Sequence, residues 1–293
     1  GTTIEGMRVL WESDADAVPE QVTEMQALGL AVEELTPDAL ADRYPAVATD
    51  GLAAGAIAHS AGTVDPAAVV SHLASRARTA GVRVRTGTPA TLSGPTTVET
   101  SGATEVYDVV VVAAGPATGP LVDAVGVALA LRCYRAQALV TDPIEEPLPS
   151  LYDATRECYW RPHGDGLLVG DGAHAVDPEE CATDADPAFV ESALERVRGA
   201  TALVPDVARS WAGCCTATPD RDPLVGPVAD GLWVAAGWQG HGLMRAPAIG
   251  EHVADRLLGA SPRLGVPVGA QFDPMRFDGD EQFHPLGDPT AEW

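Results

Sequence analysis

Apolar residues recur at helical spacing in several stretches of the chain, and each stretch opens with a proline that a helix tolerates in its first turn. These openings are Val18-Pro19, Thr36-Pro37, Asp65-Pro66 and Asp186-Pro187. The clearest helix is expected over residues 66–80, because Gly81 ends it and Val82-Arg83-Val84 then alternates like a strand. This order predicts a compact helix–strand unit.

A different pattern occupies positions 109–114, where six small or β-branched apolar residues follow one another before Gly115-Pro116. A strand without alternation predicts burial on both faces, which is typical of a mainly parallel sheet covered by helices. Residues 232–237 form a second such run, followed by a glycine-rich turn and a helix that continues to Gly259. Both runs end in glycine, and open α/β sheets bind nucleotides at this carboxyl end of their strands.

Between these runs the apolar residues alternate, which predicts antiparallel strands with a hairpin turn at His163–Gly166. The sequence therefore predicts a mixed α/β fold in which a nucleotide-binding-type α/β part is interleaved with an antiparallel-sheet substrate part. The expected divisions are 61–124 and 224–259 for the first part, 6–60 and 125–223 for the second, and 260–293 for an extended C-terminal tail.

The net charge of the chain excludes some classes of binding partner. The 293 residues include 42 acidic and 18 basic side chains, every basic one is arginine, and the formal net charge is −24. Such a surface repels nucleic acid and anionic lipid. The dispersed acidic excess is typical of a halophilic protein, although the absence of lysine also fits a GC-rich genome. No apolar run approaches the roughly 18 residues of a membrane span, and no secretory signal opens the chain, so we expect a cytoplasmic protein.

The cysteines and histidines show no pattern that indicates a metal site. The five cysteines are odd in number and lack CxxC spacing, which favours reduced thiols over a disulfide framework. They are Cys133, Cys158, Cys181, Cys214 and Cys215. The histidines are dispersed without ligand spacing, so no metal is expected.

The glycine-rich turn after residue 236 is the first candidate for chemistry. Gly237, Gly240 and Gly242 place bare backbone N–H groups at a helix start, where the helix dipole favours a phosphate or an anionic cofactor ring. His241 adds a hydrogen-bond donor or a charge. A tight structural turn without a ligand is the alternative interpretation of this pattern.

Three stretches in combination carry a resemblance to a known family. They are residues 109–115, the TPDRDPLVG segment at Thr218–Gly226, and residues 231–259 with their GHG and Ala246-Pro247. Together they resemble the flavin-dependent D-amino-acid oxidase superfamily, especially its glycine oxidase, sarcosine oxidase and dimethylglycine dehydrogenase branch, from about Gly6 to Gly259. The resemblance implies an enzyme that oxidises an amino acid or N-methyl amino acid by hydride transfer to FAD, as oxidase or dehydrogenase.

The family opens with a strand, a GxGxxG turn and a helix that hold the cofactor pyrophosphate, and this chain shows no such unit. We expect a larger, carboxy-terminal part of a longer flavoprotein, or a chain whose GxGxxG turn comes from a separate N-terminal segment or subunit. Three alternatives remain open: a short protein that binds flavin poorly, a 2-hydroxy-acid or glycerol-3-phosphate-type FAD dehydrogenase, and a flavin-free subunit that needs a partner chain.

The resemblance assigns the cofactor residues position by position. Val84 corresponds to an adenine-side contact, and Ala114 and Gly115 to the wall beside ribose and phosphate. The residues implied to line the isoalloxazine and the ribityl chain are Gly237, Gln239, Gly240, His241, Gly242 and Leu243. The cysteine to which sarcosine oxidases attach their flavin falls at Gly213, so FAD is expected to bind non-covalently.

The substrate residues depart from the family. Cys215 stands where glycine and D-amino-acid oxidases have an arginine, and Met244 where sarcosine oxidases have a lysine. A carboxylate in a partly dry pocket needs a charge-assisted partner, so Arg161 or Arg245 is expected to supply it. Tyr159 matches a family tyrosine that contacts substrate, and with Arg161 and His241 it completes the expected catalytic set. A surface ion pair is the alternative for Arg161.

Overall fold

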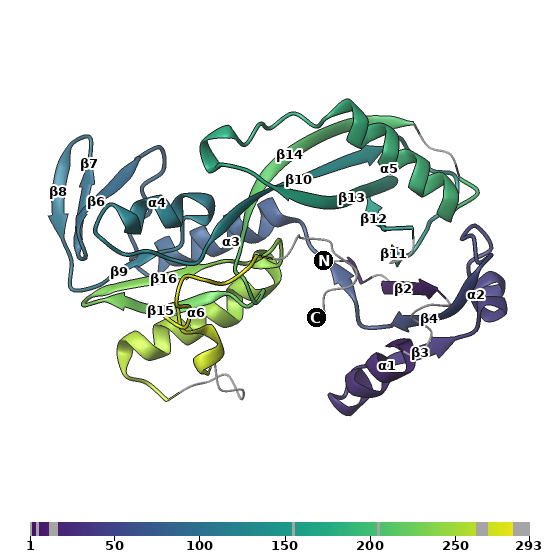
Figure 1. Cartoon of the computed structure of the whole chain (residues 1–293), viewed down its shortest axis with the longest axis horizontal. Coiled ribbons are helices and arrows are strands. Elements are labelled where there is room, and N and C mark those ends of the chain that lie inside the picture. Colours follow the sequence, from purple (N-terminus) through teal and green to yellow (C-terminus); the bar gives the residue numbers. More distant parts are fainter. Residues whose placement is uncertain are drawn as a thin grey trace.

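A computed structural model describes residues 2–3, 6–11, 17–153, 156–203, 206–261 and 269–283. The chain forms two bodies, a large sheet flanked by helices and a smaller body of short sheets and helices (Figure 1). Two long strands, β10 and β14, run from one body into the other. The predicted fold class, a mixed α/β protein with an antiparallel sheet, is confirmed.

The large sheet has eight strands among the described residues, and only β11 and β2 pair in parallel there. Its spatial order is β14 (Val207–Ala217), β10 (Arg132–Thr141), β13 (Gly166–Ala175), β12 (Cys158–His163), β11 (Ser150–Asp153), β2 (Gly6–Trp11), β4 (Leu52–Ala58) and β3 (Val32–Leu35). The predicted hairpin turn is confirmed, since His163 pairs with Gly166 across β12 and β13.

One face of this sheet packs against α5 (Pro187–Ala200), which begins at the predicted Asp186-Pro187. Trp160 of β12 is fully buried there, and its indole N–H donates to the Pro149 carbonyl at 2.9 Å. Helices α1 (Ala17–Ala27) and α2 (Pro37–Arg43) lie beside β3 and β4 and confirm the two short helices predicted before residue 50. Because side chains alternate along a strand, the neighbours of Trp160 point to the opposite face.

The smaller body contains two three-stranded sheets. One has the order β15 (Leu224–Ala229), β16 (Leu232–Ala236) and β9 (Val110–Val112), and the other is a meander of β6 (Ala90–Gly94), β7 (Thr97–Thr100) and β8 (Ala103–Val106). The helices of this body are α3 (Pro66–Thr79), η2 (Gly115–Ala117), α4 (Thr118–Asp123) and α6 (Gly242–Leu258). Short pieces complete the chain: β1 (Thr2–Thr3) paired with β5 (Gly62–Thr63), η3 (Pro178–Glu180) and η4 (Ala270–Phe272).

The prediction that residues 109–114 are buried on both faces is wrong. Val112 is 6% exposed, whereas Val109 and Val111 are each 39% exposed. The strand β9 pairs with β16 on one side and lies at the edge of the described sheet. The face of β9 that carries Val111 is therefore only partly buried among the described residues.

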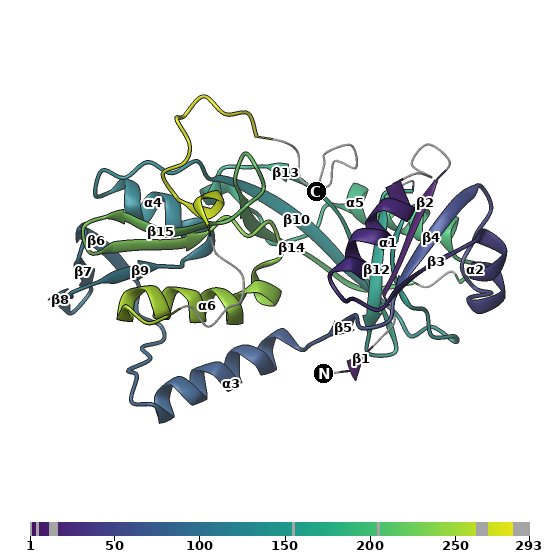
Figure 2. The same cartoon turned by 90° about the horizontal axis from the view of Figure 1, so that it is seen from below.

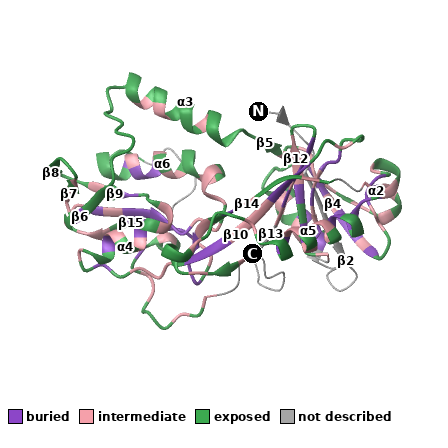
Figure 3. Cartoon of the chain, turned by 90° about the horizontal axis from the view of Figure 1, so that it is seen from above, coloured by how far each residue is buried: buried purple, intermediate pink, exposed green. Residues whose placement is uncertain are grey.

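The expected compact helix–strand unit at residues 66–84 is also corrected. The helix α3 forms as predicted, with the Asp65 carboxylate accepting from the Ala67 and Ala68 N–H groups at 2.8 and 3.1 Å. None of its residues is buried, however, and Figures 2 and 3 show α3 standing apart from α6 and the sheets. Residues 82–84 form no strand, because no described strand pairs with them.

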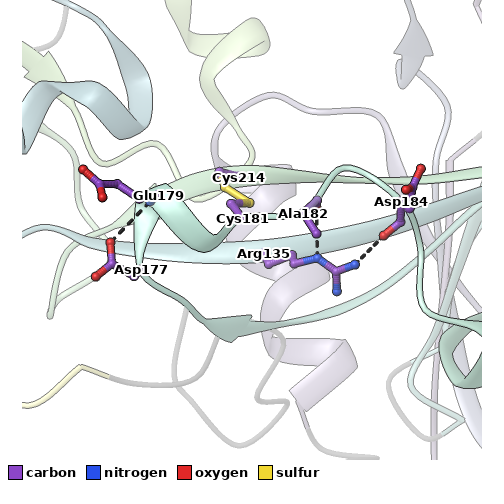
Figure 4. Close-up of a disulfide and its surroundings, with 7 residues drawn as sticks. All are labelled: Arg135, Asp177, Glu179, Cys181, Ala182, Asp184 and Cys214. Atoms are coloured by element: carbon purple, nitrogen blue, oxygen red, sulfur yellow. Dashed lines mark hydrogen bonds between the residues drawn. A yellow bond between two sulfur atoms is a disulfide. The ribbon is translucent and has the colours of Figure 1, made fainter.

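A disulfide joins Cys181, which follows η3, to Cys214 on β14, with the two Cα atoms 6.2 Å apart (Figure 4). The expectation that the cysteines are reduced thiols is therefore wrong for this pair. The sequence spacing of 33 residues carries no signal, because the loop after η3 reaches β14 through tertiary contacts such as the Ala212 N–H donating to the Thr183 carbonyl at 2.7 Å. Arg135 on β10 holds the same loop, with Nε donating to the Ala182 carbonyl at 3.1 Å.

Replacing Cys181 in a Cys181→Ser variant is expected to lower the free energy of unfolding by about 3 to 4 kcal/mol, because the disulfide closes a loop of this length in the unfolded chain. Denaturant unfolding with and without a thiol reductant measures the effect. The reductant should destabilise the wild-type chain to the level of the variant and leave the variant unchanged. An equal response of both proteins to the reductant would contradict the disulfide.

Candidate functional site

The predicted cofactor residues that follow β9 and β16 lie at one edge of the smaller body. The strands β9 and β16 pair in parallel, with Val112 opposite Val234, so their carboxyl ends lie side by side. Ala114 and Gly115 follow the first strand, and Gly237 follows the second. The Ala114 N–H donates to the Thr118 hydroxyl at 3.0 Å, which fixes the start of η2.

The glycine turn is held in an unusual backbone conformation. Gly237, Gln239 and Gly240 have positive φ values of 79°, 51° and 83°. The Gly237 N–H donates to the Thr216 hydroxyl at 3.3 Å, and the Gln239 N–H donates to the Thr216 carbonyl at 2.9 Å. Thr216, at the end of β14, was missed by the sequence analysis, because nothing in its immediate surroundings marks it as a partner of the turn.

The helix α6 begins at this turn without a capping side chain. His241 is its N-cap residue and makes no side-chain hydrogen bond to the first turn, so the opening N–H groups of α6 remain available to a ligand. A Cβ atom added at Gly115 or Gly240 would meet no described atom within 4 Å, so there is open space next to both backbones. These features fit the phosphate and ring of a bound flavin nucleotide.

The surroundings of His241 favour its uncharged form near neutral pH. Its burial lowers the pKa of the imidazole below the ordinary value of 6.5, and the nearby positive charge of Arg245 lowers it further. The sequence analysis left both roles open, and the direction of this shift favours the uncharged donor.

The TPD segment forms a rigid loop beside the turn. The Thr218 hydroxyl donates to the Asp222 carbonyl at 2.7 Å, and the Gln239 side-chain amide donates to the Arg221 carbonyl. Arg276, from the C-terminal segment, donates to both oxygens of Asp220 at 2.7 and 2.8 Å. No local pattern identifies Arg276, since it lies 56 residues from its partner.

Tyr159 and Arg161 lie on the face of the large sheet opposite the α5 core, because they flank the buried Trp160 on β12. Burial raises the pKa of Tyr159, and the neighbouring Arg161 partly opposes the shift. The phenol therefore stays protonated and can donate a hydrogen bond at neutral pH. Gly170 of β13 lies opposite Tyr159, and a Cβ atom there would come within 3.4 Å of the tyrosine ring.

A pocket of about 690 Å³ connects the two bodies. Its wall consists of the first half of α3 with the preceding residues, the β12–β13 hairpin from Arg161 to Gly164, and Pro247 of α6. Arg161 therefore shares a cavity with the helix that begins at the glycine turn. This pocket is the candidate active site.

The other predicted substrate and cofactor residues differ in how far they are buried and in whether they lie near the glycine turn. Cys215 lies opposite Tyr134, and burial raises the pKa of its thiol to about 11, so it remains protonated. Met244 is 72% exposed on the first turn of α6, and Arg245 follows it beside His241. Val84 is 38% exposed in the segment after α3, and no hydrogen bond among the described residues links it to the turn.

In the described part of the chain, no group of three or more histidine, cysteine or carboxylate side chains is placed to hold a metal ion. The same residues contain no helix that is long and apolar enough to cross a bilayer. His284, one of the dispersed histidines, lies outside the described residues.

A glycine turn at the carboxyl ends of parallel strands, next to an antiparallel sheet that carries Tyr159 and Arg161, defines a nucleotide-cofactor oxidoreductase of two interleaved bodies. The chain belongs to the FAD dependent oxidoreductase family (DAO), whose sequence profile matches residues 4–256. The resemblance inferred from the motifs is thereby confirmed, and with it the enzyme class and FAD as the cofactor of the family.

Curated relatives agree with this family. Glycine oxidase from Pseudomonas putida is 33% identical over 174 residues, which cover 57% of this chain and 46% of the relative. Mitochondrial dimethylglycine dehydrogenase from Rattus norvegicus is 27% identical over 274 residues, covering 83% of this chain and 31% of the relative. The chain thus matches less than half the length of these two enzymes.

Solved structures show the same fold. L-proline dehydrogenase from P. horikoshii superposes with a TM-score of 0.83 at 21% identity, covering 96% of this chain and 78% of the other. Glycine oxidase from Geobacillus kaustophilus also gives 0.83, at 23% identity, with 95% and 76% coverage.

Two glycine substitutions are expected to separate the structural role of the turn from its cofactor role. In Gly237→Ala the new Cβ meets the Thr218 methyl at 2.8 Å, so the free energy of unfolding should fall by about 2 kcal/mol or more. In Gly240→Ala the methyl enters open space and only the strain of an alanine at a φ of 83° remains, so stability should fall by about 1 kcal/mol while FAD affinity falls as well. Denaturant unfolding measures the stability of the two variants, and FAD titration measures their cofactor affinity. If Gly237→Ala were no less stable than Gly240→Ala, the structural role assigned to Gly237 would be contradicted.

Acid should destabilise the protein in part through His241. Because the pKa of His241 is lower in the folded chain, the unfolded chain binds the proton more readily as pH falls below about 6.5, and stability decreases there. His241→Gln should therefore lose less stability between neutral pH and the pKa of the folded state. Parallel unfolding curves with His252→Gln, a second histidine with a lowered pKa, show whether the effect is specific to the turn.

Proposed function

We propose that this chain oxidises an amino acid or N-methyl amino acid with FAD as the hydride acceptor. One observation carries the proposal: Arg161 of the substrate sheet and Pro247 of the cofactor helix α6 line the same 690 Å³ pocket. A substrate bound to Arg161 would therefore lie next to the element that positions the flavin.

The cofactor would be held by backbone groups at the edge formed by β9 and β16. The turn from Gly237 to Leu243 and the start of α6 offer N–H donors and a positive helix end, and Ala114 with Gly115 forms the neighbouring wall. Val84 would contact the adenine side. Binding is non-covalent in this proposal, because Gly213 replaces the attachment cysteine and the Cys215 thiol stays protonated.

The substrate carboxylate would be bound by Arg161 with help from Tyr159. Cys215 replaces the usual arginine, and Met244 is turned to solvent, so neither can supply the charge. Arg161 is planar and can donate two parallel hydrogen bonds to a carboxylate. The protonated Tyr159 phenol adds a donor, and His241 adds an uncharged one from the cofactor side.

The exposed apolar surface indicates where a further unit would bind. Val70 and Leu73 of α3 are 59% and 48% exposed, and Val111 of β9 is 39% exposed at a sheet edge. A strand that pairs with β9 and a helix that covers its bare face would bury these residues. We assign this surface to a strand–helix–strand unit with a GxGxxG turn, on the same or a separate polypeptide.

Visible absorbance of the purified chain in high salt, before and after FAD addition, tests this function. A flavin spectrum that survives desalting and is bleached anaerobically by an amino acid or N-methyl amino acid is expected, and Arg161→Gln should raise the substrate KM about tenfold or more. Bleaching only by a 2-hydroxy acid or glycerol 3-phosphate would overturn the substrate assignment. A colourless chain should become coloured once the GxGxxG unit is added.

A further inference from the structure

The open face of the large sheet carries a row of side chains that ends in two arginines. Strand pairing places Arg209 of β14 opposite Val140, Val140 opposite Leu168, and Leu168 opposite Arg161. Directly opposite residues in antiparallel strands point to the same face. Arg209 and Arg161 therefore lie on the face that also bears Tyr159.

His163 links the two arginines. Arg209 Nη2 lies 3.3 Å from His163 Nε2, and the Arg209 guanidinium stacks on Trp211 at 4.9 Å from the ring centroid. Because a guanidinium only donates, His163 Nε2 accepts and Nδ1 carries the hydrogen. Arg161 lies two residues before His163 on the same face of β12, and both line the candidate active-site pocket.

In a chain of net charge −24, an ion pair with a carboxylate is one frequent role of arginine. Among the described residues, Arg43, Arg85, Arg135, Arg156 and Arg276 each form an ion pair with a carboxylate.

Arg161 instead contacts the Pro162 carbonyl and Tyr159, and Arg209 contacts His163 and Trp211. The one carboxylate in the pocket lining, that of Asp65, already accepts two backbone N–H groups of α3. Asp65 contributes one negative charge to the pocket wall, but neither Arg161 nor Arg209 forms an ion pair with a described carboxylate.

Resting on the function proposed above, we infer that the substrate is a dicarboxylic amino acid. Its α-carboxylate lies on Arg161 and Tyr159, and its side-chain carboxylate is bound by Arg209 and His163. Alternate residues on a strand are about 7 Å apart, which suits the two ends of an extended molecule of glutamate length. The two guanidinium groups match two separate carboxylates better than one.

The substrate test compares glutamate with glutamine, which has the same shape without the second charge. With flavin-loaded protein and both enantiomers, anaerobic flavin reduction should show kcat/KM about ten- to a hundredfold higher for glutamate. Arg209→Gln should remove this preference, because it lowers kcat/KM for glutamate far more than for glutamine. Arg198→Gln, an exposed arginine on α5 across the sheet, is the matched control and should leave both values unchanged.

A binding test without turnover keeps this inference separate from the proposed function. Glutarate should raise the melting temperature of the wild-type chain, and butyrate and inorganic phosphate should not, with the glutarate effect lost in Arg209→Gln. Equal use of glutamate and glutamine, or stabilisation by phosphate but not glutarate, would overturn the dicarboxylate assignment. If no amino acid reduces the flavin, the proposed function fails, while the glutarate result still decides the subsite.

Discussion

The antiparallel pairing of β10 with β14 is the constraint on which the rest of the site depends. The pairing runs from Arg132 opposite Ala217 to Thr141 opposite Val207, so it spans both bodies of the molecule. At one end Thr216 holds the glycine turn through its hydroxyl and its carbonyl. At the other end the same two strands carry Arg209 and Val140 into the substrate face. A change of register by one residue would invert both ends together.

Arginine contacts between segments distant in sequence stabilise loops that the pairing of β10 with β14 does not include. Arg276 binds the Asp220 carboxylate and the Asp222 carbonyl, and thereby attaches the C-terminal segment to the loop beside the turn. Arg135 donates to Ala182 and Asp186 in the loop that also carries Cys181. In an acidic chain, ion pairs between these guanidinium groups and partly buried partners contribute more to stability than exposed ion pairs would. Five described arginines thus form ion pairs with carboxylates, whereas Arg161 and Arg209 form none with a described acidic side chain.

The sequence predicted those elements whose structure is determined by interactions between residues close in sequence. The proline-opened helices, the His163–Gly166 hairpin and the glycine turn each depend on residues close in sequence, and the structure confirms them. The disulfide of Cys181 and Cys214, the contact of Arg276 with Asp220 and the role of Thr216 depend on contacts between segments distant in sequence, which local spacing does not encode. The prediction of helix cover over β9 was wrong for a related reason. An apolar run indicates that burial is favourable, but it does not indicate which element provides it.

The exposed face of α3 connects cofactor binding to substrate binding. The first half of α3 and the residues before it form one wall of the pocket, and no residue of the helix is buried. Few contacts therefore hold this wall. A unit that covered α3 would add contacts to it, and the resulting order would lower the entropic cost of binding substrate. By reciprocity, substrate bound to Arg161 would then strengthen the attachment of that unit.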